Sequence, residues 1–93
     1  MALKVKIPTP LRRHTAGASS VDANGTHVGE VLNDLTQRYP GVSERLFDGD
    51  GQLKSHLNVF LNNEDIRFLN GLETPVRDGD TVVLLPALAG GAA

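Results

Sequence analysis

Regular spacing of apolar residues predicts three strands. In residues 3–7 (LKVKI) and again in residues 57–61 (LNVFL), every second position carries an aliphatic side chain. Side chains spaced two residues apart share one face of a strand, so each segment is expected to bury one face. Residues 81–85 (TVVLL), which precede Pro86, predict a final strand with apolar residues on both faces.

Weaker signals predict two shorter strands and the loops between elements. Residues 18–23 are centred on Val21 and precede the turn dipeptide Asn24-Gly25. Residues 62–65 predict a turn, and residues 66–68 a short return strand. Residues 11–20 are small and polar, which favours a turn or loop there.

One segment has the periodicity of a helix. Apolar residues at i, i+4, i+7 and i+11 share one helical face: Val28, Leu32, Leu35 and Tyr39. Thr26 is the expected N-cap of this helix, and Pro40-Gly41 is expected to end it. Residues 43–47 predict a further helical turn.

These elements predict an α+β fold in the β-grasp, or ubiquitin-like, layout. One main helix would cover one face of a small mixed sheet, with the first and last strands paired in parallel at its centre. Residues 1–86 are expected to form this domain. Residues 87–93 carry neither charge nor a periodic pattern and are expected to form a flexible tail.

Composition excludes several classes of protein. A chain of 93 residues has room for one small domain, and its net charge of −2 argues against nucleic-acid binding, which requires a basic face. The absence of cysteine excludes disulfides, thiolate nucleophiles and cysteine-bound zinc. Because there is neither a long apolar run nor a signal segment at the N-terminus, a cytoplasmic protein is expected.

The chain contains no motif typical of an active site. His14, His27 and His56 lack the spacing of a metal site, so surface or capping roles are expected for them. The carboxylates of residues 64–65 and 78–80 fall in predicted turns, where we expect them to be solvated rather than paired for acid–base work. Since no phosphate-binding loop occurs either, we expect no enzyme, no metal site and no bound cofactor.

The C-terminal segment carries the most informative residues of the chain, Gly90 and Gly91. A carboxylate is a poor electrophile and reacts only after one oxygen is replaced by a good leaving group, such as the phosphate of an acyl-adenylate. A nucleotide-binding enzyme that forms this adenylate must hold the last residues in a narrow site. Glycine suits such a site because it lacks a Cβ and allows another backbone to approach closely.

A second feature lies beside this tail on the predicted sheet. Phe60 lies on the strand face opposite Leu57, and Val83 and Leu85 share one face of the last strand. One helix covers only one sheet face, so Phe60, Val83 and Leu85 are expected to form an exposed apolar patch that contacts partner proteins. The alternative is that loops cover these residues.

Several segments resemble the ubiquitin-like sulfur-carrier family, whose members include MoaD-like and ThiS-like proteins. The resemblance covers nearly the whole chain and rests on these stretches: residues 7–9 (IPT), 41–46 (GVSERL), 58–67 (NVFLNNEDIR), 78–80 (DGD), 85–86 (LP) and 89–91 (AGG). The second and third stretches indicate the cysteine-biosynthesis branch of the family.

The resemblance implies a mechanism in which this chain is a co-substrate. A ubiquitin-activating-like enzyme adenylates Gly91 with ATP, and sulfide equivalents displace AMP to leave a C-terminal thiocarboxylate. Leu88, Ala89 and Gly90 would be the residues that the enzyme recognises in the tail. In the cysteine branch, a pyridoxal-phosphate synthase presents the sulfur acceptor, and a JAMM-type zinc metalloprotease releases cysteine. ATP, pyridoxal phosphate and zinc then belong to partners.

One departure from the family pattern is that Ala92-Ala93 follow the diglycine. They block the carboxylate of Gly91 with a peptide bond, so cleavage between Gly91 and Ala92 by a JAMM-type metalloprotease is expected to precede activation. Other sulfur acceptors stay open: a thiosugar or other natural product, molybdopterin, thiazole or tRNA. A ubiquitin-like modifier joined to targets through Gly91, or a binding module with an idle tail, also stays open.

Overall fold

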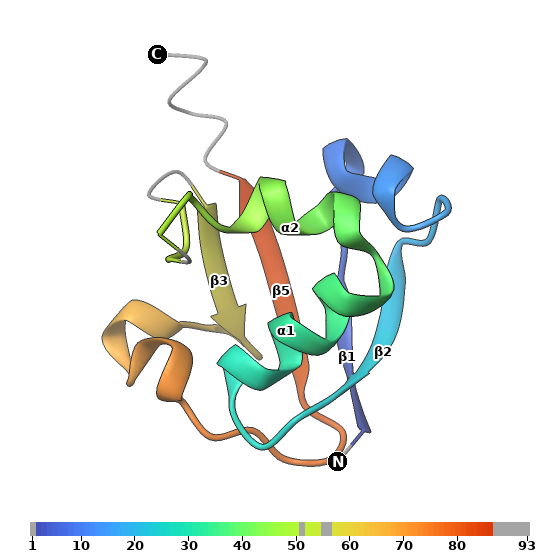
Figure 1. The fold of residues 1–93 in the computed structure, drawn as a ribbon. Coiled ribbons are helices and arrows are strands. Elements are labelled where there is room, and N and C mark those ends of the chain that lie inside the picture. Colours follow the sequence, from blue (N-terminus) through green and yellow to red (C-terminus); the bar gives the residue numbers. More distant parts are fainter. Residues whose placement is uncertain (1, 51, 55–56, 87–93) are drawn as a thin grey trace.

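The computed structural model describes residues 2–50, 52–54 and 57–86, which form one sheet with helices packed on one side (Figure 1). Within these residues the sheet has five strands in the order β2-β1-β5-β3-β4. Their bounds are β1 Ala2–Lys6, β2 Ser20–Asn24, β3 Leu57–Leu61, β4 Glu64–Asp65 and β5 Thr81–Pro86. The predicted strand at residues 57–61 is confirmed. β1 is shifted by one residue toward the N-terminus relative to its prediction, and β5 extends one residue further than predicted.

The sheet is mixed, as predicted. β1 and β5 run parallel at its centre, with Val5 opposite Val82. β2 pairs antiparallel with β1, and β3 pairs antiparallel with β5 over five residue pairs. The two strands of the central pair are far apart in the sequence. Parallel pairing requires a long crossover connection, and the segment that contains the helices supplies it.

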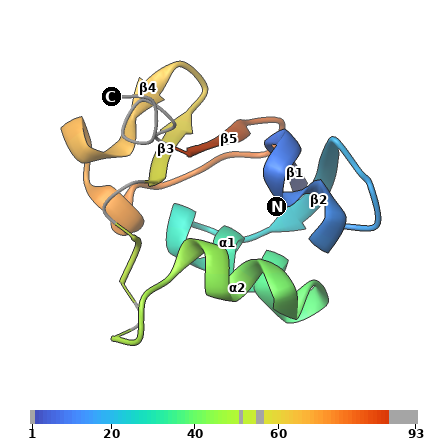
Figure 2. The same cartoon turned by 90° about the horizontal axis from the view of Figure 1, so that it is seen from above.

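Two α-helices cover one face of this sheet: α1 (Val28–Arg38) and α2 (Pro40–Leu46) (Figure 2). Val28, Val31, Leu32 and Leu35 of α1 are completely buried against apolar residues of the central strands, including Val5 and Val82. Pro40 does not only end the first helix. It is the first residue of the second, where its fixed φ fits a helix and its missing N–H is not needed.

The N-terminus of α1 corrects one expectation. Its N-cap is His27, not Thr26, because the His27 Nδ1 accepts the Glu30 N–H at 3.1 Å. Thr26 instead donates its backbone N–H and its hydroxyl to the Glu30 carboxylate, at 2.8 and 2.7 Å. These hydrogen bonds lower the pKa of Glu30. The exchange resembles a capping box with the cap shifted by one residue.

Two short segments also differ from the predictions. The expected loop over residues 11–20 begins as a 3-10 helix, η1 (Thr9–His14). The expected strand at residues 66–68 is another 3-10 helix, η2 (Ile66–Phe68), and the return strand consists of Glu64–Asp65 only. The Asp65 carboxylate accepts the Arg67 backbone N–H at 2.9 Å, which caps this turn and directs the chain away from the sheet. A third 3-10 helix, η3, spans Gly71–Glu73.

Candidate functional site

The strand that leads to the tail is fixed at the centre of the sheet. β5 lies between β1 and β3, and its last residue, Pro86, is opposite Leu57. The tail residues singled out in the sequence, Leu88, Ala89, Gly90, Gly91 and Ala92, lie outside the described residues. What the structure establishes is therefore the surface from which they depart.

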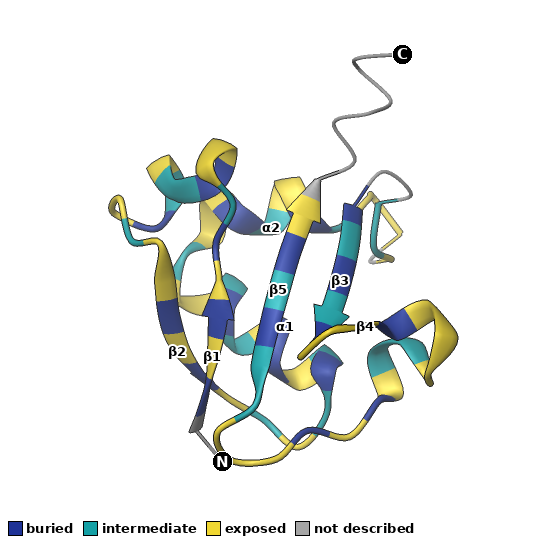
Figure 3. Ribbon diagram, turned by 180° about the vertical axis from the view of Figure 1, so that it is seen from behind, coloured by how far each residue is buried: buried dark blue, intermediate teal, exposed yellow. Residues whose placement is uncertain are grey.

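The structure brings Phe60, Val83 and Leu85 together on one face of the sheet, because their neighbours Val59, Val82 and Leu84 are buried on the other face. Figure 3 shows the molecule from the side of the sheet opposite α1 and α2. Val83 is the register partner of Phe60, and Leu85 follows it on the same face of β5. Phe60 and Val83 are partly buried, whereas Leu85 is 45% exposed. No described helix lies over this part of the sheet. We refer to Phe60, Val83 and Leu85 as the outer patch; its predicted role in docking stays a prediction.

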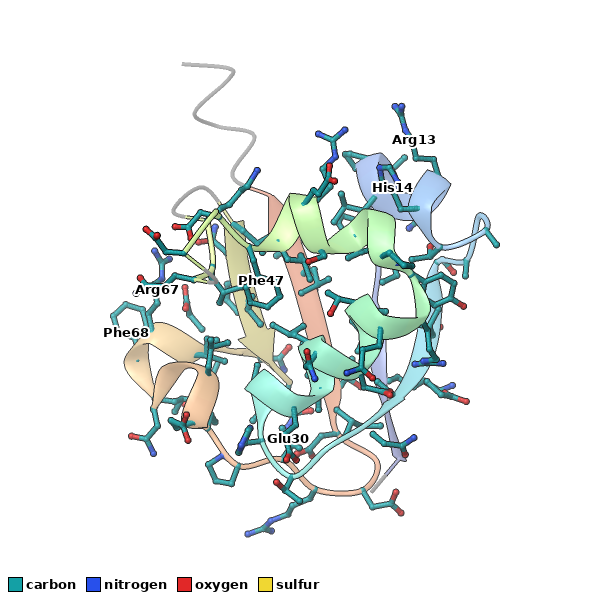
Figure 4. All side chains as sticks on the ribbon, viewed as in Figure 1. Arg13, His14, Glu30, Phe47, Arg67 and Phe68 are labelled. Carbon is teal, nitrogen blue, oxygen red and sulfur yellow. The ribbon has the colours of Figure 1, made fainter. Side chains whose placement is uncertain are left out.

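Two cationic side chains flank the outer patch. Lys6 on β1 is the register partner of Val83 and is exposed. On the other side, the Arg67 Nη2 donates to the Asn58 Oδ1 at 2.8 Å, and Asn58 is the register partner of Leu85. Arg67 lies on the β3 side of the molecule, far from Arg13 and His14 (Figure 4).

Arg67 is held by Asp65. The Arg67 Nε lies 3.2 Å from each Asp65 oxygen, and the Nη2 donates to Oδ2 at 2.8 Å. These hydrogen bonds lower the pKa of Asp65 and raise that of Arg67. The expectation that the carboxylates of residues 64–65 are both solvated is wrong for Asp65, whose side chain is 9% exposed. The spacing of Asp65 and Arg67, two residues apart in a turn, was the sequence signal that could have predicted this ion pair.

A hollow of the described surface lies at the edge of β3. Its volume is about 600 Å³, and apolar side chains form most of its wall: Leu53, Leu57, Val59, Ile66 and Leu72. Gln52, Lys54 and Arg67 are the polar residues of the wall. Among the described residues of this wall there is no carboxylate, histidine or hydroxyl group, so these residues are suited to contact with an apolar group rather than to acid–base chemistry.

The two described histidines, His14 and His27, contact other parts of the fold. His27 caps α1, as its expected role allowed. His14 packs against Gly41, where an added Cβ would come within 2.7 Å of the His14 Nδ1. No group of three or more potential metal ligands occurs among the described residues, and no described helix is long and apolar enough to cross a membrane. His56 lies outside the described residues.

The mixed five-stranded sheet, with α1 and α2 on one face and no described helix on the other, defines a small ubiquitin-like β-grasp domain. The sequence matches the ThiS family over residues 5–91. The chain therefore belongs to this family of ubiquitin-like sulfur carriers.

Individual relatives agree with this assignment. The chain is 50% identical over 93 residues to the sulfur carrier protein CysO of Mycobacterium tuberculosis, covering 98% of this chain and all of that protein. A crystal structure of M. tuberculosis CysO matches with a TM-score of 0.85 and 48% identity, over 91% of this chain and 98% of that one. A chain in the crystal structure of the Amycolatopsis orientalis BexX/CysO complex matches with a TM-score of 0.88 and 47% identity. The match covers 96% of this chain and 99% of that one.

A modifier protein is also similar to this chain. Small archaeal modifier protein 3 of Haloferax volcanii is 42% identical over 71 residues, which cover 76% of this chain and 75% of that protein. The proteins similar to this chain thus include some that are named as sulfur carriers and others that are named as modifiers.

Proposed function

We propose that this chain carries sulfur as a thiocarboxylate on Gly91 and donates it for the biosynthesis of cysteine. The observation that carries the proposal is the 50% identity to the sulfur carrier CysO along the whole chain. The diglycine Gly90-Gly91 supplies the tail that this chemistry needs. In this role the chain is a co-substrate, and catalysis belongs to its partners.

Activation requires a free carboxylate on Gly91. Removal of Ala92-Ala93 by a JAMM-type metalloprotease would supply it, and the family match, which ends at residue 91, supports this step. An oxygen of the new carboxylate then attacks the α-phosphorus of ATP and releases pyrophosphate. A sulfide equivalent attacks the acyl carbon of the adenylate, AMP leaves, and the thiocarboxylate remains.

The outer patch is proposed as the surface on which the adenylating enzyme docks. Leu85 is one residue from the end of β5, so an enzyme that covers it is close to the point where the tail departs. The crystal structure of a BexX/CysO complex supports partner binding by a similar chain. The final acceptor would be a pyridoxal-phosphate cysteine synthase.

The intact mass of the protein from its native cells, isolated without reducing agents or added thiols, tests the proposal. We expect loss of Ala92-Ala93 and replacement of one terminal oxygen by sulfur during growth on limiting sulfur. In the matched variant Gly91→Ala, trimming and sulfur loading are expected to fail while the fold is retained. Detection of the 93-residue chain alone under these conditions would refute the proposal.

A second candidate function is covalent modification of other proteins through Gly91. The similarity to small archaeal modifier protein 3 favours it. Both functions begin with adenylation, so the tail does not separate them. Isopeptide adducts between Gly91 and lysines of cellular proteins, without a thiocarboxylate, would replace the carrier proposal with this one.

A further inference from the structure

We infer that this chain binds the adenylating enzyme through Lys6 and Arg67, two cations that lie on either side of the outer patch. The enzyme would present carboxylates on both sides of an apolar centre. This inference rests on the proposed function, because it describes the partner of that function.

The strand order sets the spacing of the two cations. Lys6 is on β1, the patch residues are on β5 and β3, and Arg67 is held against Asn58 of β3. Neighbouring strands are about 4.8 Å apart, and Asn58 lies two residues along β3 from the residue level with Lys6, so the backbones of Lys6 and Asn58 are roughly 12 Å apart. An interface that covers Val83 and Leu85 therefore reaches both charges.

Lys6 is an uncompensated charge in the described part of the structure. Lys4, two residues earlier on the same face, is paired with Asp22 at 3.2 Å. Lys6 has no ion pair within the described residues. It contributes to the wall of a shallow hollow that also contains Asn62, Asn63, Thr81 and Val83, and no carboxylate is among these residues. A partner that covers this hollow must itself supply the negative charge, because burying an unpaired ammonium is unfavourable.

Arg67 is preorganised for the same kind of contact. Asp65 and Asn58 together engage its Nε and Nη2, while its side chain stays 62% exposed. Within the described residues its Nη1 makes no hydrogen bond. A guanidinium held in this way retains donors for a carboxylate of the partner and loses little side-chain entropy when that contact forms. Asp65 is therefore a positioning residue for Arg67.

The test is ATP–pyrophosphate exchange by the purified adenylating enzyme of the same organism, with the chain trimmed at Gly91 as the varied substrate. Lys6→Glu is expected to raise the KM for the chain at least tenfold at unchanged kcat, because it alters docking and not the tail. The matched control is Arg77→Glu, an exposed position in the loop before β5 with the same change of charge. Its KM is expected to equal that of the wild type.

Arg67→Lys keeps the charge but loses the planar hydrogen-bonding geometry, so a smaller rise in KM is expected. The wild-type KM should also increase with salt more steeply than that of Lys6→Glu. Circular dichroism establishes that each variant is folded. If the wild type supports exchange and both variants stay within twofold of its KM, this inference is wrong and the proposed function stands. If the trimmed wild type supports no exchange, the proposed function fails, and the inference fails with it.

Discussion

The carboxylate of Asp65 connects local turn structure to the surface beside the outer patch. It accepts the Arg67 backbone N–H, which fixes the turn after β4, and it holds the guanidinium that reaches Asn58. One buried side chain thus determines both where the sheet ends and where a positive charge lies on its outer face.

Asp65 should make stability depend on pH. Its pKa is lowered in the folded state from an ordinary value of 3.8, so folding favours the ionised form. The stabilisation is fully present above the unfolded-state pKa and is lost as the pH falls through the lower folded-state pKa. Urea unfolding at a series of pH values should show Asp65→Asn less stable than the wild type at neutral pH, with a difference that shrinks in acid. The control Glu64→Gln, which changes the neighbouring exposed carboxylate, should show no such pattern.

Gly25 lies in the connection from β2 to α1 and packs closely against the helix. An added Cβ would lie 2.8 Å from the Val31 backbone nitrogen, which moves only if the helix moves. Gly25→Ala is therefore expected to destabilise the domain by about 1–3 kcal/mol, the usual range for overpacking. Gly49→Ala is the matched control, since an added Cβ there has no neighbour within 4 Å among the described residues. Equal urea midpoints for the two variants would contradict this prediction.

At the scale of elements, α1 packs against the sheet through apolar side chains that are completely buried, among them Leu32. Leu32→Ala is expected to lower the free energy of unfolding by about 2–5 kcal/mol, because it removes apolar contacts and leaves a cavity. The control Gln37→Ala, at an exposed position of the same helix, should change it by less than about 0.5 kcal/mol. Urea unfolding measures both, and a loss below 1 kcal/mol for Leu32→Ala would speak against this packing.

Elements with several periodic residues were predictable from the sequence, and the shortest ones were not. The strand at residues 57–61 and the helix around Leu32 each have a repeating pattern that matches the sheet or helix period. The 3-10 helices η1 and η2 depend on individual hydrogen bonds that no periodicity encodes. In η1 the Leu11 N–H donates to the Pro8 carbonyl, and in η2 the Arg67 N–H donates to the Asp65 carboxylate. The N-cap was misplaced by one residue because Thr26 and His27 both have a capping acceptor.

The candidate site was predictable to the same extent. Alternation along two strands was enough to place Phe60, Val83 and Leu85 on one face. The positions of Lys6 and Arg67 beside the patch were not predictable from the sequence. The position of Lys6 depends on which strands are neighbours, and that of Arg67 depends on its side chain reaching Asn58 of β3. Sequence periodicity reports the face of a residue, whereas lateral position requires the strand order.

At the scale of the whole molecule, the domain is expected to be complete without its tail. β5 pairs with β1 as far as Val83 and with β3 as far as Pro86, so a chain that ends at Pro86 retains every strand of the described sheet. Its free energy of unfolding should differ from that of a chain ending at Gly91 by less than about 0.5 kcal/mol, as for a surface change. Only the longer chain should support ATP–pyrophosphate exchange. A large loss of stability would show instead that the tail contributes to the fold.

The parallel pairing of β1 and β5 also has a mechanical consequence. The start of β1 and the end of β5 lie at opposite ends of the sheet (Figure 1). A force applied at Pro86 along β5 loads its hydrogen bonds to β1 and β3 in shear, so that many bonds must break together rather than one after another. Resistance to force is governed by the rate of unfolding. In the proposed activation, in which a partner binds the last residues in a narrow channel, the sheet is expected to keep its structure under such a force.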